Sequence, residues 1–445
     1  MVTILPALRQ VREDLAGLLE RKEVERICRE LEYAWRERQL DPYTTLHLFI
    51  LQMVNQNTAM THLPHLSGER FSASAYCQAR QRLPLALIQR LVDSFSCGLE
   101  KSDPAGLWQG HRVVLIDGSG FSMPDTPELQ AYFGQPSQQK PGCGFPVGHM
   151  LAMLDANAGF VHDVIISPLR THDMKHAADL HPKLRPGDIV VADRGFCSYA
   201  HLALILQANL HGVLRIHQRL IVNFHPHRPC ARDILGKGIP NSRWVERLGH
   251  CDQIVDWCKP QSRPKWMDPE QFANLPETIR VREIKWCIAD RSCRVYEVTL
   301  VTSLLDAKRY PAREIAGLYE VRWQVEVDLR DLKITLGLDV LKGHKVETVT
   351  KEALVCVLVH NMVRAVMLKA AQRQRVSPRR ISFIDALRWL QPPKPDAPLP
   401  ELVINPLRPG RIEPRCIKRR PKEYDRMNRP RDELRKRLKK RRDAA

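Results

Sequence analysis

From residue 111 onward, short apolar runs alternate with helical segments, and this alternation leaves few folds open to the chain. Two segments, 173–181 and 198–209, have helical periodicity. Five apolar runs bounded by turn residues are predicted as strands: 112–117, 150–156, 160–167, 188–193 and 212–218. Strands that alternate with helices indicate an α/β sheet with parallel members.

The first 100 residues are predicted to be helical. Segments 10–39 and 43–54 carry apolar residues at helical spacing. The stretch at 68–95 predicts two short helices broken before Pro84, with Ser72 or Ser74 as the first cap. A helix-turn-helix DNA reader and an ordinary packed helical bundle both fit this pattern.

Beyond residue 218 the pattern changes twice. Residues 219–300 contain β-like runs, beginning with RLIVNF at 219–224, and predict an all-β insertion. A long helical pattern then runs from 311 to about 336, an apolar helix covers 350–370, and a Pro-rich linker leads into a basic tail. We expect a helical N-terminal domain for DNA binding or assembly at 1–105 and the first part of the core at 106–218. The β-strand insertion follows at 219–303, the second part of the core at 304–390, and the linker with the basic tail at 391–445.

The charge of the chain points to a polyanionic partner. Lys and Arg number 69 against 50 Asp and Glu, which gives a net charge of +19. Residues 408–445 hold 17 of the basic and 6 of the acidic side chains, yet the rest of the chain is also basic. Such a bias favours nucleic acid over an anionic membrane surface. The tail is either a DNA-backbone contact or a solvated arm without a specific role.

Cysteine usage and hydropathy indicate an intracellular protein. The twelve cysteines include no C-x-x-C pair, so we predict neither a zinc site nor a disulfide framework. The N-terminus lacks the apolar core of a signal peptide. The best candidate for a membrane span, the uncharged stretch 195–214, contains His201, Gln207, Asn209 and His211, so it fails as a span. The histidines are scattered, and none is assigned to a metal.

Two of the predicted strands end in an aspartate. Asp117 closes VVLID and Asp193 closes IVVAD. In open α/β sheets ligands bind beyond the carboxyl ends of the strands, where two carboxylates can converge on a cation. Either residue alone is equally compatible with a turn or a cap.

One face of the predicted helix at 311–336 combines one acid with several cations. At about 100° per residue, Tyr319, Arg322, Glu326 and Lys333 fall within a wedge of about 60°, and Arg330 lies close to it. A solvated, salt-bridged face is the alternative, although such a face usually alternates in sign at i and i+4. Three cations around one carboxylate suit a phosphate backbone beside a metal site.

At these residues the sequence resembles a known family, the Asp-Asp-Glu (DDE) transposases of bacterial insertion sequences, in the insertion-sequence-four group. Tyr319, Arg322, Glu326 and Lys333 match the signature Y-x2-R-x3-E-x6-K without a gap. The first-Asp block of the group is matched at 117–126 by DGSGFSMPDT, and the second at 193–196 by DRGF. The three blocks occur in order, and the resemblance covers roughly residues 110–370.

The resemblance implies a ribonuclease-H-like catalytic core in an α/β fold. It also implies two Mg²⁺ ions, for which Mn²⁺ can substitute. Asp117 is assigned as the bridging ligand, with Asp193 on one metal and Glu326 on the other. Two divalent ions activate a nucleophilic water and stabilise the leaving 3′-oxygen of a phosphodiester. The same site can use a DNA 3′-OH as the nucleophile, which turns hydrolysis into strand transfer.

Further residues are assigned to DNA by the same resemblance. Tyr319, Arg322 and Lys333 would grip phosphates beside the scissile bond and hold the backbone around a flipped base, which costs a few kcal/mol to unstack. Trp323 either stacks on DNA or packs in the core against the sheet. Arg330 and Arg194 complete the predicted DNA contacts.

Three features have structural interpretations. Asp125 is interpreted as a loop cap and Asp188 as a strand-start residue. The apolar segment at 353–359 is interpreted as core packing.

The expected function is that of a DNA transposase which binds the terminal inverted repeats of its insertion sequence, cleaves the ends and joins their 3′-OH groups to target DNA. A ribonuclease-H-fold nuclease or resolvase without strand transfer is the first alternative. A transposase-derived DNA-binding protein is the second. The expected partners are double-stranded DNA and a second copy of the chain on that DNA, with no membrane, in the bacterial cytoplasm and at the nucleoid.

Overall fold

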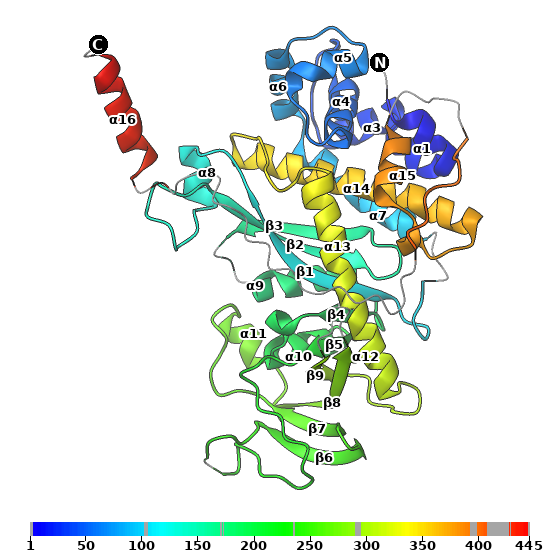
Figure 1. The fold of residues 1–445 in the computed structure, drawn as a ribbon, viewed down its shortest axis with the longest axis vertical. Coiled ribbons are helices and arrows are strands. Elements are labelled where there is room, and N and C mark those ends of the chain that lie inside the picture. The colour runs from blue at the N-terminus through cyan, green and yellow to red at the C-terminus, as the bar shows by residue number, and fades with distance from the viewer. Residues whose placement is uncertain are drawn as a thin grey trace.

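The protein is a mixed α/β structure built around one large sheet (Figure 1). The computed structural model describes residues 3–101, 106–169, 171, 173–234, 236–289, 295–391, 398–406, 427 and 429–443. The N-terminal helices lie at one end of the molecule, and strands β6 to β9 lie at the other.

The sheet has nine strands in the order β3-β2-β1-β4-β5-β9-β8-β7-β6. Strand β1 is parallel to β4, and β4 is parallel to β5, while the remaining neighbours are antiparallel. The α/β prediction with parallel members is thus confirmed, and all five predicted strands are present. The strands span Val113–Ser122, Val147–Asp155, Val161–Pro168, Ile189–Ala192, His211–Arg215, Ser242–Gly249, Asp252–Cys258, Thr278–Ala289 and Val295–Thr302.

The segment predicted as an all-β insertion differs from that prediction in two places. Residues 219–224, all of which the structure describes, form no strand, and Pro226 and Pro229 follow in the next turn. A short helix, α11 (Pro269–Ala273), lies between β7 and β8. Asp268 caps it by accepting from the amides of Glu270 and Gln271. This start signal, a capping Asp followed by Pro, was present in the sequence.

Helices cover both faces of the sheet. Alternate residues of β1 enter different cores: Val113 and Leu115 pack with the N-terminal helices, α13 and α14, whereas Val114 and Ile116 pack with α9 and α10. These helices of the sheet faces span Asp173–Ala177 (α9), Tyr199–Gln207 (α10), Gln324–Arg330 (α13) and Val346–Gln374 (α14).

Seven α-helices precede the sheet in the described part of the chain; α1 to α4 and α7 pack in the core that contains Val113 and Leu115, whereas α4, α5 and α6 also enclose a small separate cluster of Leu48, Leu63 and Tyr76. The break predicted before Pro84 separates α6 from α7, and Ser72 is the cap of α6, accepting from the amide of Ala75. Helix α7 packs along α14. The seven span Leu5–Val11, Glu13–Gly17, Arg21–Glu30, Pro42–Val54, Leu63–Ser67, Ala73–Arg82 and Leu85–Glu100. The domain division at residue 105 remains a prediction.

The segment predicted as one helix at 311–336 changes its winding twice. Helix α12 (Ala312–Glu320) passes through a 3₁₀ turn at Val321–Trp323 into α13, which ends in a π-helical turn at Asp331–Thr335. Because 3₁₀ and π turns advance by angles other than 100° per residue, a uniform helical wheel misplaces side chains here.

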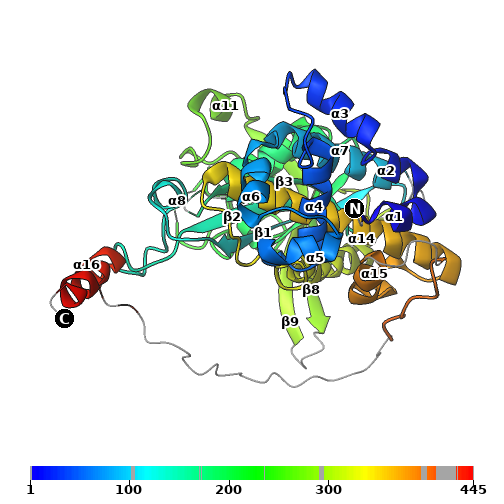
Figure 2. The same cartoon turned by 90° about the horizontal axis from the view of Figure 1, so that it is seen from above.

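Helix α14 meets the length and apolarity of a membrane span, and 94% of its most apolar window is buried inside the protein. The predicted core role of residues 353–359 is thereby confirmed, since every one of them is buried. Helix α15 (Phe383–Leu390) packs on α14. Of the basic tail, residues 427 and 429–443 are described, and they include α16 (Arg431–Arg442), which stands apart from the body (Figure 2).

Candidate functional site

The two aspartates predicted at strand ends lie at the same level of the sheet, although β1 continues past Asp117 to Ser122, so that only Asp193 follows the end of its strand. Strands β1 and β4 are parallel neighbours, with Ile116 opposite Ala192. The next residues of the two strands are Asp117 and Asp193. Parallel register therefore brings the carboxylates side by side, as the sequence pattern indicated.

Both aspartates also point to the same face of the sheet. Side chains alternate along a strand, and Leu115 and Val191 belong to the core that α13 covers. Asp117 follows Leu115 by two residues, and Asp193 follows Val191 by two with its backbone still extended. The carboxylates therefore face α13, which crosses in front of β1 (Figure 1).

Asp117 is partly enclosed, with 24% of its side chain exposed. Burial raises its pKa above the usual value, and the negative charges of Asp193 and Glu326 add to the rise. The Gly118 amide, which donates to Asp117 Oδ1 at 2.8 Å, and the Arg322 guanidinium oppose it. A cation between these carboxylates would relieve their mutual repulsion.

Two side chains of the α12–α13 segment bind the aspartates. The Tyr319 hydroxyl donates to Asp193 Oδ1 at 3.1 Å, and burial raises the pKa of this phenol well above its usual value, so it remains a donor. Arg322 lies 3.7 Å from Asp117 and 3.5 Å from Glu326, which connects the sheet to the helix carboxylate. Residues from β1, β4 and α13 are thereby brought into one cluster.

Arg322 is buried in that cluster, with only 5% of its surface exposed. Its Nε has no hydrogen-bond partner among the described residues, and its guanidinium lies 4.3 Å from the Trp323 ring. The distances to Asp117 and Glu326 exceed hydrogen-bonding range, so both are ion pairs only. Tyr319 and Arg322 therefore lie inward beside the carboxylates, whereas the uniform wheel put them on one face with Lys333.

The outer face of the same segment is partly apolar. Trp323 is 42% exposed, so the interpretation of this residue as a core Trp was wrong. Val327 and Ile334 are exposed as well, and Arg330 is exposed beside them. Trp323 and Arg330 are thus open to a ligand, and their assignment to DNA remains a prediction.

The two other predicted DNA contacts have partners of their own. Lys333 forms an ion pair with Asp339 at 3.2 Å. Arg194 is exposed and donates from Nη1 to Gln218 Oε1 at 2.8 Å. Neither residue contacts the carboxylate cluster directly.

Behind α13, sequence analysis missed a second charged group. Asp328 is completely buried and accepts from Arg379 Nη1 at 2.6 and 2.7 Å and from Arg364 Nη2 at 2.6 Å. Arg379 also donates to the carbonyl oxygens of Asp155 and Ala156, at the end of β2. This rear network fixes α13 between α14 and the sheet, with Glu326 on its open side.

Arg215 is a second missed residue. It closes β5, the parallel neighbour of β4, and its charge acts on Tyr319. No signal in the sequence indicated it, because Arg215 lies in the middle of the strand predicted at 212–218, whereas the observed strand ends at this residue.

The two secondary aspartates have clear structural roles. Asp188 precedes β4 and accepts from the Arg112 guanidinium and the Arg185 amide, which fits its interpretation as a strand-start residue. Asp125 is not a cap: Thr126 caps α8 (Pro127–Tyr132), and Asp125 instead pairs with Arg431 at 3.2 Å.

As the side chains stand, the described part of the chain contains no group of three or more His, Cys, Asp or Glu residues placed to hold a metal ion. The donor chemistry nevertheless fits a divalent cation. Asp117, Asp193 and Glu326 offer only carboxylate oxygens, the ligands that Mg²⁺ prefers. A cationic guanidinium, that of Arg322, already lies between two of them.

Comparisons with known proteins match the part of the chain that contains these carboxylates. Residues 108–362 match the family model of the transposase DDE domain. The transposase InsG of insertion sequence element IS4 from Escherichia coli (strain K12) is 26% identical over 395 residues, covering 84% of this chain and 82% of InsG. InsZ of the same organism, provisionally named a transposase, is 28% identical over 164 residues, or 34% of this chain and 54% of InsZ.

Among solved structures, the piggyBac transposase synaptic complex with hairpin DNA aligns with 88% of this chain and 80% of that one, at 10% identity and a TM-score of 0.44. The family match covers more than half of the chain and contains all three carboxylates of the site. The chain therefore belongs to the DDE transposases, as an enzyme of the IS4 type.

Proposed function

We propose that this protein binds the terminal inverted repeats of its own insertion sequence, cleaves the ends and joins the 3′-OH ends to target DNA. The observation that carries the proposal is that two side chains of the α12–α13 segment connect the three carboxylates to one another. Tyr319 binds Asp193, and Arg322 connects Asp117 with Glu326. The core is proposed to be ribonuclease-H-like, with β1, β4 and α13 carrying the catalytic residues.

Asp117, Asp193 and Glu326 would hold the divalent cations, proposed to be two Mg²⁺ ions or two Mn²⁺ ions. Bound there, the cations would activate the attacking water or 3′-OH and stabilise the leaving oxygen. Glu326 is suited to adjusting its position when a cation binds, because 55% of its side chain is exposed. Asp117 is suited to a fixed position, since it lies within β1 and accepts from the Gly118 amide.

Arg322 and Tyr319 would position the reacting phosphate. The two ion pairs of Arg322 lack hydrogen bonds, so little free energy holds its guanidinium on the carboxylates. With Asp117 and Glu326 engaged as ligands of a cation, the guanidinium would be free to donate two parallel bonds to a DNA phosphate. Trp323, which lies against Arg322, would stack on a base unstacked beside the scissile bond.

The proposal extends to partners and location. Joining two DNA ends in one reaction favours a homodimer on double-stranded DNA. We place the protein in the bacterial cytoplasm at the nucleoid, where its DNA substrate lies. A nuclease or resolvase without strand transfer is the alternative, and the side chains poised for phosphate around Glu326 favour the transposase.

The test is incubation of the full chain with its own element ends and Mg²⁺, followed by mapping of the 5′ and 3′ products and of strand-transfer joints. Glu326→Gln should stop cleavage. Glu320→Gln is the matched control, because Glu320 is an exposed acid on the same helical segment outside the cluster. Cleavage without joints would favour the nuclease, and equal activity of the two variants would contradict the assignment of Glu326.

A further inference from the structure

The C-terminal helix α16 is charged on every side. Its twelve residues include eight Lys or Arg and two acidic residues. Every side chain from Arg435 to Lys440 is exposed, including Leu438, which is 63% exposed. An isolated helix of this length is marginal in water, and repulsion between its cations weakens it further.

One end of this helix is nevertheless fixed to the body of the protein. Arg431 Nη1 donates to the Gly144 carbonyl at 2.9 Å, and the same guanidinium pairs with Asp125 at 3.2 Å. The guanidinium lies 4.0 Å from the Phe145 ring centroid, and the Arg431 amide donates to the Gly142 carbonyl at 3.1 Å. A single residue of α16 therefore makes three contacts with the loop between α8 and β2 and a fourth with Asp125, which precedes α8.

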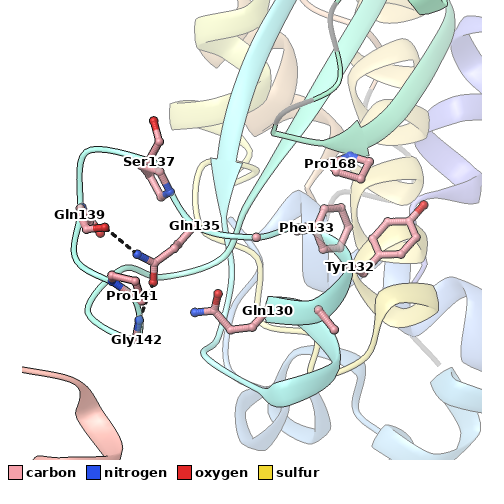
Figure 3. A pocket seen from close by; sticks show the side chains of 12 residues that line it. Gln130, Tyr132, Phe133, Gln135, Ser137, Gln139, Pro141, Gly142 and Pro168 are labelled. Atoms are coloured by element: carbon pink, nitrogen blue, oxygen red, sulfur yellow. Dashed lines mark hydrogen bonds between the residues drawn. The ribbon is translucent and has the colours of Figure 1, made fainter.

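That loop is ordered by its own hydrogen bonds. The Gln135 side-chain amide donates to the carbonyls of Gln139 and Lys140 at 3.0 and 2.8 Å (Figure 3). Its oxygen accepts from the amides of Gly142 and Gly144 at 3.0 and 3.2 Å. The two carbonyls that receive Arg431 thus belong to residues that are already held in place.

The loop also leaves room for the start of the helix. Gly142 has a φ of +76°, and a Cβ at this position would lie 3.0 Å from Pro430 Cβ. Any other residue would be strained in its backbone and crowded against Pro430. Asp125 lies eight residues after Asp117, so this docking point is connected to the strand that carries the carboxylate cluster.

The charges of α16 favour duplex DNA over a membrane surface as its partner. A helix that binds a membrane surface needs a continuous apolar face, whereas α16 offers only Leu434 and Leu438. A helix of 12 residues is about 18 Å long. Duplex DNA carries about ten phosphates over that length of its axis, and neutralising them releases condensed counterions.

We propose that α16 is an anchored arm that binds the phosphate backbone of double-stranded DNA without sequence preference, held by Arg431 on Asp125 and on the loop between α8 and β2. The proposal rests on the proposed function for the choice of DNA as the partner. DNA supplies the counter-charge that the isolated helix lacks, and the anchor fixes where along the protein the duplex is held.

The first test removes the charge of the arm. Arg435, Lys436, Lys439 and Lys440 are all changed to Gln in the full chain, and binding to a random-sequence duplex is titrated against salt without divalent metal. The slope of log K against log salt should become shallower by about 3–4. A matched control changes four exposed cations near the opposite end of the sheet to Gln: Lys237, Arg243, Arg247 and Lys265.

The second test releases the anchor and keeps every cation of the arm. Asp125→Asn combined with Phe145→Ala should weaken duplex binding about three- to tenfold. Combined with the four Gln changes in the arm, the same pair should have almost no further effect, because the anchor acts only through the arm. Thermal unfolding of each variant checks that the body remains folded.

Three results would overturn the proposal: an equal loss of salt dependence in the control set, additive effects of anchor and arm, or a larger loss of binding to phosphatidylglycerol vesicles than to DNA. Because the assay uses random DNA without metal, it is independent of cleavage. An enzyme that fails to cut its element ends would contradict the proposed function and leave this binding result intact.

Discussion

Two carboxylates two residues apart on α13 have opposite environments. Glu326 is 55% exposed and its one ion pair, at 3.5 Å, is loose. Asp328 is completely buried and accepts three hydrogen bonds of 2.6–2.7 Å from two arginines. The charge of Asp328 is therefore saturated by the protein, whereas that of Glu326 remains available to a ligand.

The arginines on the two sides of the helix differ in the same way. Arg379 binds both oxygens of Asp328 and two backbone carbonyls, so its donors are used within the protein. Arg322 is also buried, yet its ion pairs are long and its Nε has no partner among the described residues. Removing one member of a saturated buried pair leaves an uncompensated charge, while an under-coordinated buried group is typical of functional sites. The rear network is thus expected to act on stability and the front cluster on catalysis.

The largest expected effect is the loss of catalysis from the front cluster. Asp117→Ala, Asp193→Ala and Glu326→Ala should each reduce cleavage of element ends by at least about 10³-fold, with binding of the ends largely retained. Residues that act as one unit fail together, so double mutants should be no slower than single mutants. Single-turnover cleavage in Mg²⁺ measures this, and near-native nicking by any one variant would remove that residue from the site.

The rear network should give the largest change in stability. Asp328→Ala leaves Arg364 and Arg379 without their shared carboxylate, which should lower the free energy of unfolding by about 3–5 kcal/mol. Urea denaturation of Asp328→Ala beside Glu326→Ala makes the comparison, because the second variant should unfold almost like the wild type. If Asp328→Ala and Glu326→Ala lowered the free energy of unfolding to a similar extent, the front cluster would contribute to stability as much as the rear network does.

A smaller effect is expected from the cations near Glu326. Arg322→Ala and Lys333→Ala should slow cleavage about a hundredfold through misplacement of the phosphate, while affinity for the ends falls only modestly. Arg322→Lys should not restore the rate, since a point charge does not replace a planar fork. Ends that are already unpaired beside the scissile bond should recover part of the lost rate. A loss of affinity as large as the loss of rate, without relief by unpairing, would make this a general DNA-binding surface.

The sequence predicted the front cluster better than the rear one, for a physical reason. Asp117, Asp193 and Glu326 each follow from local signals: two strand ends and one helical signature. The partners of Asp328 lie 36 and 51 residues further along the chain, in α14 and just beyond it. No periodicity within α13 indicates which distant cation meets a buried acid.

The wrong predictions have two causes: local changes in helical winding, and contacts between residues that are far apart in the sequence. The wheel at 100° per residue placed Tyr319 and Arg322 on one face with Lys333, but beside the 3₁₀ turn at Val321–Trp323 Tyr319 and Arg322 are buried and Trp323 is exposed. Asp125 has the composition of a cap, and its partner Arg431 is more than 300 residues away. The five core strands were predictable because apolar runs and the turn residues that bound them are local features.

The smallest expected effect concerns a second carboxylate of the rear face, and it depends on pH. Burial raises the pKa of Asp331 from 3.8 to about 6, and the neighbouring charge of Asp328 contributes to the rise. Because the folded-state pKa is raised, the stability from the protonated form is fully present below about pH 4 and is lost as the pH rises through 6. Asp331→Asn, which is neutral at every pH, should therefore unfold like the wild type near pH 4 and be more stable by about 1–3 kcal/mol at pH 8. Urea denaturation of both proteins across this range gives the difference directly. A difference that stayed constant with pH would show that Arg364, 3.4 Å away, keeps Asp331 ionised in the folded state and that the rear network holds two saturated carboxylates rather than one.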